Sequence, residues 1–324
     1  MKILITGGKG YLGIHLVKAF EKLNFEILVL DIKKERSIED ISKSLFRQLD
    51  INHLKDFERI LKIFKPEIVF HLAAKKNVVE SFSLPEEYLR FNSEITYQLA
   101  DISNRVGVSK FIFISSAAVY GSPKKTEVSE VHECLPTSPY GLSKLLAEEK
   151  LREGSKEWNM KVSCIRLFNL FGYDPNLVHL FNLSEGDNFQ SYICRAITSG
   201  KPIRVFRSKN QTSDGTTERD YIHPNDASRA LVNLALKDSL NHFDIVNLGT
   251  GVKISSYELA RVSSANFKDG IQIILEPARD FEVDTIVANV NYIRDVLGNF
   301  EATSSSSSLT EFIRPDNLSF PHSG

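Results

Sequence analysis

Short apolar runs alternate with amphipathic stretches along the first half of the chain. A strand buried on both faces of a parallel sheet has a continuous apolar run, whereas a surface helix carries apolar residues three and four positions apart. The runs predict strands at Ile3–Ile5, Glu26–Asp31, Leu45–Leu49, Glu67–Ala74, Lys110–Ser115 and Lys161–Arg166. The amphipathic stretches predict helices at His15–Leu23, Leu54–Phe64, Glu86–Val106 and from Tyr140 onward.

This alternation predicts an α/β fold with a doubly wound parallel sheet, a Rossmann fold. Because crossover connections are right-handed, the carboxyl ends of the strands meet along one edge, and ligands bind at that edge. Beyond Phe168 the strands are shorter and the loops longer. We therefore expect a Rossmann domain over residues 1–168 and a smaller C-terminal α/β substrate region over residues 169–324, parts of which return to the Rossmann sheet. The second half is predicted to contain strands at Ile203–Phe206, Asp244–Leu248 and Ile271–Leu275 and a helix at Pro224–Leu236.

Three other segments show neither pattern. The charged stretch Ile32–Ser44 predicts a solvated loop or a short helix. The serine-rich stretch Thr303–Ser308 predicts a low-complexity loop, and Phe320–Gly324 predicts a loose tail.

Three glycines, Gly7, Gly10 and Gly13, follow the first predicted strand. In a dinucleotide-binding loop they permit a tight turn, close approach of the backbone to a pyrophosphate, and close packing of helix on strand, and the helix N-terminus offers free N–H groups. The next strand ends at Asp31, where such a site needs an acceptor for ribose hydroxyls. The less specific interpretation is a glycine turn and a solvated carboxylate. A P-loop is excluded, because Lys9 is followed by Gly10 and not by Ser or Thr.

Asp31 also bears on the choice of cofactor. A carboxylate there accepts a hydrogen bond from the ribose 2′-hydroxyl and repels a 2′-phosphate, so we expect NAD and not NADP. Lys33 and Lys34 lie close enough in the sequence to weaken that repulsion.

The composition is that of an ordinary soluble globular protein, since 42% of the 324 residues are hydrophobic and 25% are charged. The net charge of −1 gives no electrostatic case for binding nucleic acid or a membrane surface. The three cysteines form no C-x-x-C pair and no two histidines have metal-ligand spacing, so we expect neither disulfides nor a metal site. With no leader pattern and no membrane-spanning apolar run, the expected location is the cytoplasm.

Side chains suited to proton transfer fall at the predicted ligand edge. One strand delivers Ser116 there, and Tyr140 and Lys144 lie four residues apart at the start of a predicted helix. Residues four apart share a helix face, so the ammonium group lies near the phenol. This cation, together with a positively charged nicotinamide ring, would lower the pKa of Tyr140 from about 10 towards neutrality, as a general base for a sugar hydroxyl requires. Ser116 could hold the same hydroxyl. The alternative is an ordinary amphipathic helix with an exposed lysine.

Several motifs together resemble the extended short-chain dehydrogenase/reductases. In the first half they are Gly7-x-x-Gly10-x-x-Gly13, His71-Leu72-Ala73-Ala74, Ser115-Ser116-Ala117-Ala118-Val119-Tyr120-Gly121 and Tyr140-x-x-x-Lys144. Three later segments resemble the UDP-glucose 4-epimerase family and its nucleotide-sugar relatives: Arg166-Leu167-Phe168-Asn169-Leu170-Phe171-Gly172, Arg219-Asp220-Tyr221-Ile222-His223 and Asn247-Leu248-Gly249-Thr250-Gly251. The likeness extends from Met1 to Leu297.

The resemblance implies an NAD-dependent isomerase that inverts C4 of a UDP-hexose, UDP-glucose or UDP-galactose, through a transient 4-keto sugar. Tyr140 would take the proton from O4, Lys144 would lower the pKa of Tyr140 and hold the nicotinamide ribose, and Ser116 would orient the sugar hydroxyl. The helices at Glu86–Val106 and Ser138–Glu157 would pack between the subunits of a homodimer. The cofactor residues implied are Gly7, Gly10, Tyr11, Leu12, Gly13, Asp31, Asp50, Ile51, Ala73, Ala74, Lys76, Asn92, Tyr140 and Lys144. The substrate residues implied are Ser116, Asn169, Asn188, Arg219, Val246 and Arg279, of which Asn188, Arg219 and Arg279 would hold the uridine diphosphate.

The chain departs from the family pattern at positions that bear on the substrate. Leu167 stands where a tyrosine is common, Glu282 replaces an aspartate in a turn that has lost its glycine, and the loop Tyr173–Gly186 is short. Val246 precedes Asn247-Leu248-Gly249, where a tyrosine would narrow the sugar pocket. Its smaller side chain predicts room for a 2-acetamido group, and hence activity on UDP-N-acetylglucosamine. The competing interpretation is that Val246 belongs to the strand core.

Other functions remain as alternatives. A nucleotide-sugar dehydratase needs an acid pair where this chain has Ala117 and Ala118, and alanine cannot protonate a leaving hydroxyl. A 4-keto reductase of the same superfamily would differ in needing added cofactor. A non-catalytic NAD-binding regulator would have no need of the paired Tyr140 and Lys144.

Overall fold

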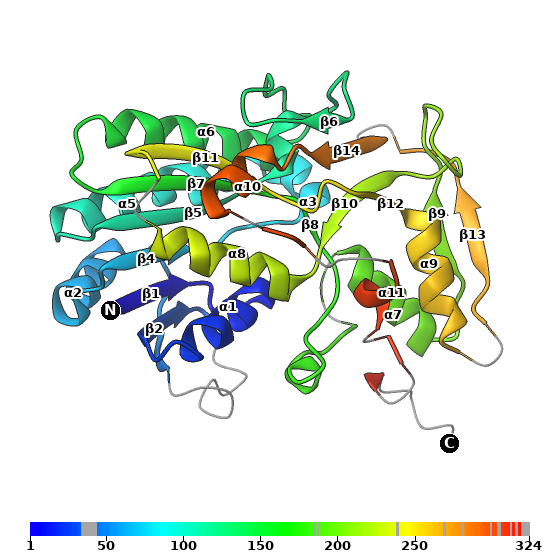
Figure 1. Ribbon diagram of the computed structural model, residues 1–324, viewed down its shortest axis with the longest axis horizontal. Coiled ribbons are helices and arrows are strands. Elements are labelled where there is room, and N and C mark those ends of the chain that lie inside the picture. Colours follow the sequence, from blue (N-terminus) through cyan, green and yellow to red (C-terminus); the bar gives the residue numbers. More distant parts are fainter. Residues whose placement is uncertain are drawn as a thin grey trace.

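The computed structural model confirms the doubly wound α/β architecture (Figure 1). Seven strands form a sheet in the order β11-β7-β5-β4-β1-β2-β3, and every pairing in it is parallel. The strands are β1 (Lys2–Thr6), β2 (Glu26–Asp31), β3 (Leu45–Gln48), β4 (Ile68–His71), β5 (Lys110–Ser116), β7 (Lys161–Leu167) and β11 (Phe243–Leu248). The structure describes residues 1–33, 44–184, 186, 188–237, 240–267, 270–279, 282–298, 300–302, 306–311, 313–314 and 317–318.

Helices cover both faces of this sheet, which explains why its strands are apolar on both sides, except at the exposed edge strand β3. Ile3 and Ile5 of β1 pack on one face with α1 (Tyr11–Glu21) and α8 (Pro224–Leu236), which lie side by side in Figure 1. Leu4 points to the other face, which is covered by α2 (Leu54–Phe64), α5 (Thr96–Arg105) and α6 (Pro139–Ser155). The strand order reverses between β1 and β4, and the carboxyl ends at this point form the expected ligand edge.

The predicted helix Glu86–Val106 is divided into three parts. It consists of α4 (Pro85–Leu89), the π-helical segment η2 (Arg90–Ile95) and α5. The first predicted helix begins at Tyr11 and not at His15, so its amino end lies directly after the glycine loop. The short α3 (Val78–Ser83) precedes α4.

Two smaller sheets lie in the second half, on the right of Figure 1. One has the order β12-β10-β14-β6, with β8 also paired to β10, and the other pairs β13 with β9. Their strands are β6 (Glu127–Val128), β8 (Asn169–Leu170), β9 (Ile203–Phe206), β10 (Glu218–Ile222), β12 (Lys253–Ser255), β13 (Ile273–Glu276) and β14 (Thr285–Ala288). The remaining helical segments are η3 (Ala117–Tyr120), η4 (Val178–Leu180), α7 (Phe189–Thr198), α9 (Ser256–Ala265), α10 (Asn291–Leu297) and α11 (Ser306–Thr310).

The chain crosses between the two halves in both directions. β11 and α8 follow residue 168 yet complete the large sheet and its covering layer, whereas β6 precedes residue 168 and pairs with β14. The division at residue 168 therefore stays a prediction about domains, not an observed boundary.

Some loop predictions can be compared with the structure and others cannot. The prediction of a loop over Thr303–Ser308 is wrong for its last three residues, because α11 begins at Ser306. Residues 34–43, 303–305 and 320–324 lie outside the described residues. None of the described helices combines the length and the apolar character that crossing a membrane requires.

Candidate active site

The glycine loop packs tightly against the neighbouring strand end. Gly7 has φ +71°, and its N–H donates to the carbonyl of Leu30 at 2.8 Å. A Cβ atom at Gly7 would lie 2.7 Å from the backbone nitrogen of Ala73, and one at Gly13 would lie 2.6 Å from the carbonyl oxygen of Gly7. Gly10 is the N-cap of α1 and provides no side-chain cap, so the first turn offers free N–H groups. Such a cradle fits the pyrophosphate of a dinucleotide.

Asp31 lies at the end of β2 and braces this loop. Its carboxylate accepts hydrogen bonds from the backbone N–H of Lys9 at 2.9 Å and of Lys33 at 3.1 Å. Lys34 lies outside the described residues. After β3, Asp50 accepts from the backbone and side chain of Asn52, while Ile51 is buried in the core.

The proton-transfer residues come together at the edge of the sheet. Ser116 ends β5, and Tyr140 lies in the first turn of α6, which Ser138 caps by accepting from the N–H of Gly141 at 3.1 Å. A Cβ atom at Gly141 would lie 2.5 Å from the carbonyl oxygen of Ala118, so this turn lies directly on η3. The side chains of Ser116 and Tyr140 are hydrogen-bonded. Lys144 is buried and donates to the carbonyl oxygen of Ile114 at 2.8 Å.

The ionisation of this group differs from the expectation. Burial raises the pKa of Tyr140, and the hydrogen bond with Ser116 only partly opposes this effect. Burial also lowers the pKa of Lys144 to about 7, against the opposing charge of Glu148. The pKa of Lys144 thus lies near neutral pH, and the side chains of the protein alone do not lower the pKa of Tyr140.

Asn92, predicted to lie at the cofactor site, links two segments beside that site. Its Oδ1 accepts from the N–H of Lys75 at 2.9 Å, and its Nδ2 donates to the carbonyl of Lys75 at 2.8 Å and to Ser143 Oγ at 3.0 Å. It therefore ties the loop after β4 to α6. π-Helical turns are frequent at functional sites, and here η2 carries Asn92. Lys76 is exposed on the same loop.

The predicted diphosphate residues lie in the second half. Arg219 of β10 is largely buried, donates to the carbonyls of Glu218 at 2.9 Å and Asp284 at 3.1 Å, and lies 3.8 Å from Glu282 Oε1. Burial lowers its pKa. The guanidinium of Arg279 stacks 3.5 Å from the ring centroid of Phe206.

The two predicted asparagines occupy different settings. Asn188 caps α7 by accepting from the N–H of Ser191 at 2.8 Å. Asn169 is exposed at the start of β8.

The prediction for Val246 is wrong. This residue is fully buried within β11, opposite Ile165 of β7, and belongs to the core cluster that α8 covers. It therefore does not line a sugar pocket, and the strand-core interpretation holds. An apolar residue two positions before the end of a strand is more simply explained by packing than by specificity.

Three further residues beside the site were not predicted as functional from the sequence. Glu148 and Arg166 form a buried ion pair, and Gln190 accepts from the N–H of Gly172 at 2.5 Å. The spacing of Glu148, four residues after Lys144 on the same helix face, and a lone Arg in an apolar strand were signals for the first two. No local pattern marks Gln190.

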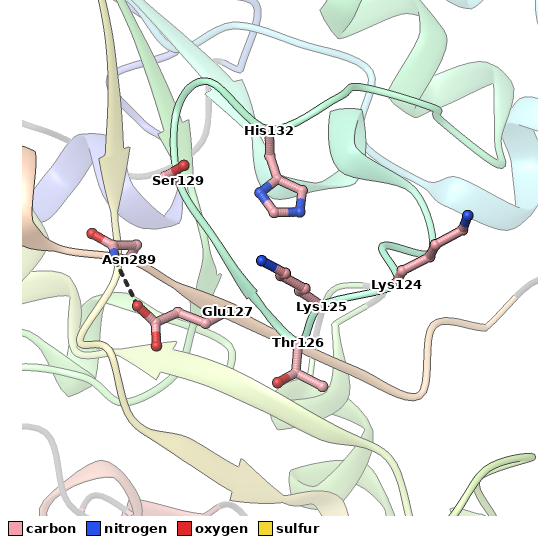
Figure 2. A pocket seen from close by; sticks show the side chains of 7 residues that line it. All are labelled: Lys124, Lys125, Thr126, Glu127, Ser129, His132 and Asn289. Atoms are coloured by element: carbon pink, nitrogen blue, oxygen red, sulfur yellow. Dashed lines mark hydrogen bonds between the residues drawn. The ribbon is translucent and has the colours of Figure 1, made fainter.

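A surface pocket elsewhere contains none of the predicted site residues (Figure 2). It lies beside β6 and β14, and Asn289 Nδ2 donates to Glu127 Oε1 at 2.6 Å along it. Since no proton-transfer group of the sheet edge faces it, it is separate from the candidate active site. Its lining residues are Lys124, Lys125, Thr126, Glu127, Ser129, His132 and Asn289. Within the described ranges, no cluster of His, Cys, Asp and Glu could hold a metal ion.

Known proteins resemble this chain over most of its length. It is 32% identical to UDP-glucose 4-epimerase of Lactobacillus helveticus over 304 residues, which is 92% of this chain and 91% of the relative. It is 33% identical to UDP-glucose 4-epimerase of Bacillus subtilis (strain 168) over 277 residues, 81% of this chain and 80% of the relative.

The fold is shared as well. The crystal structure of UDP-glucose-4-epimerase from Stenotrophomonas maltophila with bound NAD and formylated UDP-arabinopyranose superposes with a TM-score of 0.87 at 26% identity, covering 96% of each chain. The sequence profile of the NAD dependent epimerase/dehydratase family matches residues 3–249. The extent of that match, with the likeness to these epimerases, shows that the chain belongs to the NAD dependent epimerase/dehydratase family, within the extended short-chain dehydrogenase/reductases.

Proposed function

We propose that this protein is an NAD-dependent enzyme that inverts C4 of a UDP-hexose through a transient 4-keto sugar. The observation that carries the proposal is the convergence of Ser116, Tyr140 and Lys144 at the sheet edge that also holds the glycine cradle. The epimerases that resemble the chain over most of its length support the same activity.

The glycine cradle and Asp31 would hold the cofactor. The uncapped first turn of α1 would receive the pyrophosphate, and the Asp31 carboxylate would accept from the adenine ribose. When bound, NAD accepts a hydride from the sugar and returns it within one turnover. Its positively charged ring also provides the extra positive charge that the buried Tyr140 requires.

The residues of the chain move and hold a proton. Tyr140 would take the proton from the O4 hydroxyl of the sugar and give it back after the 4-keto sugar has turned over. Ser116, already hydrogen-bonded to Tyr140, would orient the O4 hydroxyl of the sugar towards the phenol. Lys144, when protonated, would stabilise the phenolate. Inversion at C4 thus needs one proton-transfer residue that both faces of the sugar can reach.

The second half would hold the uridine diphosphate. Arg219 is desolvated, and its ion pair with Glu282 is long at 3.8 Å, so an anionic ligand would compensate its charge better. Together with Arg279 it would recognise the diphosphate in the bidentate manner typical of arginine. Asn188, at the amino end of α7, and Asn169 would complete the nucleotide contacts.

The other enzyme functions of the superfamily have less support. Ala117 and Ala118 lie in η3 immediately after Ser116 and carry no acid for eliminating water. A 4-keto reductase would consume added reduced cofactor in stoichiometric amounts. The expected homodimer, packed through α4, η2, α5 and α6, and the cytoplasmic location remain predictions.

A substrate screen tests the proposed function. Purified protein is incubated without added cofactor with UDP-glucose, UDP-galactose, UDP-N-acetylglucosamine and GDP-mannose, and the products are separated by chromatography. We expect interconversion of the UDP-hexoses, with NAD recovered from the denatured enzyme. Absence of any C4 epimer, or turnover only with added reduced cofactor, would contradict the proposal. The N-acetyl sugar is included because Val246 no longer argues for or against it.

A further inference from the structure

Glu148 and Arg166 form an ion pair in the interior, next to the proton-transfer residues. Arg166 Nη2 donates to Glu148 Oε2 at 2.7 Å, and the two side chains are 4% and 2% exposed. Arg166 Nε lies 3.2 Å from both carboxylate oxygens, and the hydroxyl of Ser115 donates to Oε1 at 2.5 Å. The carboxylate is therefore held by paired residues of two adjacent strands, Ser115 of β5 and Arg166 of β7.

This pair is connected to the candidate base through α6 and β5. Lys144 and Glu148 are four residues apart on one face of α6, and they contact consecutive residues of β5. Lys144 donates to the carbonyl of Ile114, and Glu148 accepts from the hydroxyl of Ser115. Ser116, the candidate site residue, comes next on the same strand. The same two contacts thus set where Tyr140 and Ser116 lie relative to each other.

Three ionisable side chains are buried together in this region. Glu148 pairs with Arg166 and lies four residues from Lys144 on α6. A buried ion pair contributes little stability over an apolar pair of similar volume, so its retention points to another role. The other titratable or charged groups around Lys144 and Glu148 are Tyr140, Glu149 and Arg152 on α6, His71 on β4, Cys164 on β7 and Cys134 before α6.

We propose that Glu148 is a positioning residue for the Tyr140–Lys144 pair: its carboxylate, held by Arg166 and Ser115, keeps the buried Lys144 protonated. A neutral Lys144 could still donate to the carbonyl of Ile114 but would provide no charge for the phenolate of Tyr140. Glu148 acts through Lys144 and need not touch the substrate. This inference rests on the proposed function, because the reaction is its first readout.

The test is the pH dependence of kcat in Glu148→Gln. Loss of the carboxylate disfavours protonated Lys144, so the alkaline limb of the profile should move to lower pH by about 1 unit, the low end of a neighbouring-charge effect. At pH values above the alkaline limb, kcat of Glu148→Gln should be about tenfold lower than that of the wild type. KM should change little, because no substrate contact is lost. Glu148→Asp keeps the negative charge, so its alkaline limb should lie at the same pH as in the wild type. The matched control is Glu149→Gln, which removes an exposed carboxylate one residue away and should leave the profile unchanged.

Two further variants separate position from charge. Ser115→Ala removes one hydrogen bond to Glu148 but keeps its charge, so kcat should fall equally at every pH. If Glu148→Gln does not fold because Arg166 is left unpaired, the neutral pair Glu148→Gln/Arg166→Met replaces it. That variant should show the same shift of the alkaline limb, since Glu148 and not Arg166 acts on Lys144.

An unshifted limb in a folded variant that lacks Glu148, with kcat lowered equally at all pH values, would overturn the inference and leave Glu148 a structural residue. If the wild type shows no epimerisation, the proposed function fails first. The ionisation of Lys144 can then be followed by NMR of a lysine-labelled sample. Loss of Glu148 should still lower the pH at which Lys144 titrates, and an unchanged titration would overturn the inference independently of activity.

Discussion

The hydroxyl of Tyr11, in the first turn of α1, donates a hydrogen bond to the backbone carbonyl of Gly172, 161 residues further along the chain. Gln190 Oε1 accepts from the N–H of the same glycine at 2.5 Å and lies 3.3 Å from the Tyr11 hydroxyl. Tyr11 also packs against Tyr173, with ring centroids 4.8 Å apart. The start of α1, directly after the glycine loop, is thereby joined to α7, which Asn188 caps.

We therefore expect Tyr11→Phe to destabilise the protein. The carbonyl of Gly172 would lose its donor in a buried setting, which costs about 1–3 kcal/mol in the free energy of unfolding. Urea denaturation followed by circular dichroism measures this. Tyr97→Phe is the control, because the structure gives that hydroxyl no hydrogen-bond partner within the described ranges. Equal stability of the two variants would contradict the link.

Tyr140→Phe tests the base. The ring remains and only the proton-transfer group is lost, so turnover should fall by about 10²–10⁴ while the bound NAD is retained. Steady-state rates and the cofactor content of the purified variant measure both. Near-normal turnover in a folded variant would remove Tyr140 from this role.

The buried Lys144 should make stability depend on pH. Burial lowers its pKa from 10.5 to about 7, so between these values the unfolded chain holds a proton that the folded chain has released. Stability then rises with pH across this window and is independent of this group below it. The free energy of unfolding of the wild type minus that of Lys144→Met should increase from pH 7 towards pH 10. Lys150→Met, on the same helix but more exposed, should show no such trend, and a parallel trend would count against the burial of Lys144.

Asp31→Asn tests the choice of cofactor. The amide can still accept one hydrogen bond but no longer repels a 2′-phosphate, so the preference for NAD over NADP should fall by about tenfold, or ~1.4 kcal/mol. Binding of both nucleotides to the cofactor-free protein measures the ratio. Recovery of mostly NADP from the wild-type protein would overturn the prediction.

Val246→Tyr tests the corrected position of that residue. A tyrosine has no room within the core of β11, and overpacking costs about 1–3 kcal/mol or more. We expect a lower denaturation midpoint and an unchanged ratio of rates on UDP-glucose and its N-acetyl analogue. A selective loss of one substrate would return Val246 to the sugar pocket.

Local pattern in the sequence was sufficient for the first half of the fold. Apolar runs predicted all six strands of the large sheet that precede residue 168. Five of these strands are buried on both faces, which leaves few polar positions, whereas the edge strand β3 is mostly exposed. The glycine spacing predicted the cradle, and the four-residue spacing of Tyr140 and Lys144 predicted their common helix face, since both features depend only on neighbouring residues. The end of the fifth strand predicted Ser116 at the same edge, and the structure has its side chain beside Tyr140.

Only the tertiary structure decided which distant segments meet. β6 pairs with β14 and β11 with β7, so the two halves exchange strands, and this depends on packing surfaces that no local pattern encodes. The same reason places Val246 in the core, joins Tyr11 to Gly172, and brings Glu148 to Arg166 and Ser115. Burial also acts on the expected ionisation: spacing put a cation beside Tyr140, but desolvation lowers the pKa of that cation and raises the pKa of the phenol. The second part of the expectation, the charge of the nicotinamide, stays a prediction. A pKa depends on the solvent that the folded chain excludes, and exclusion is a property of the assembled structure.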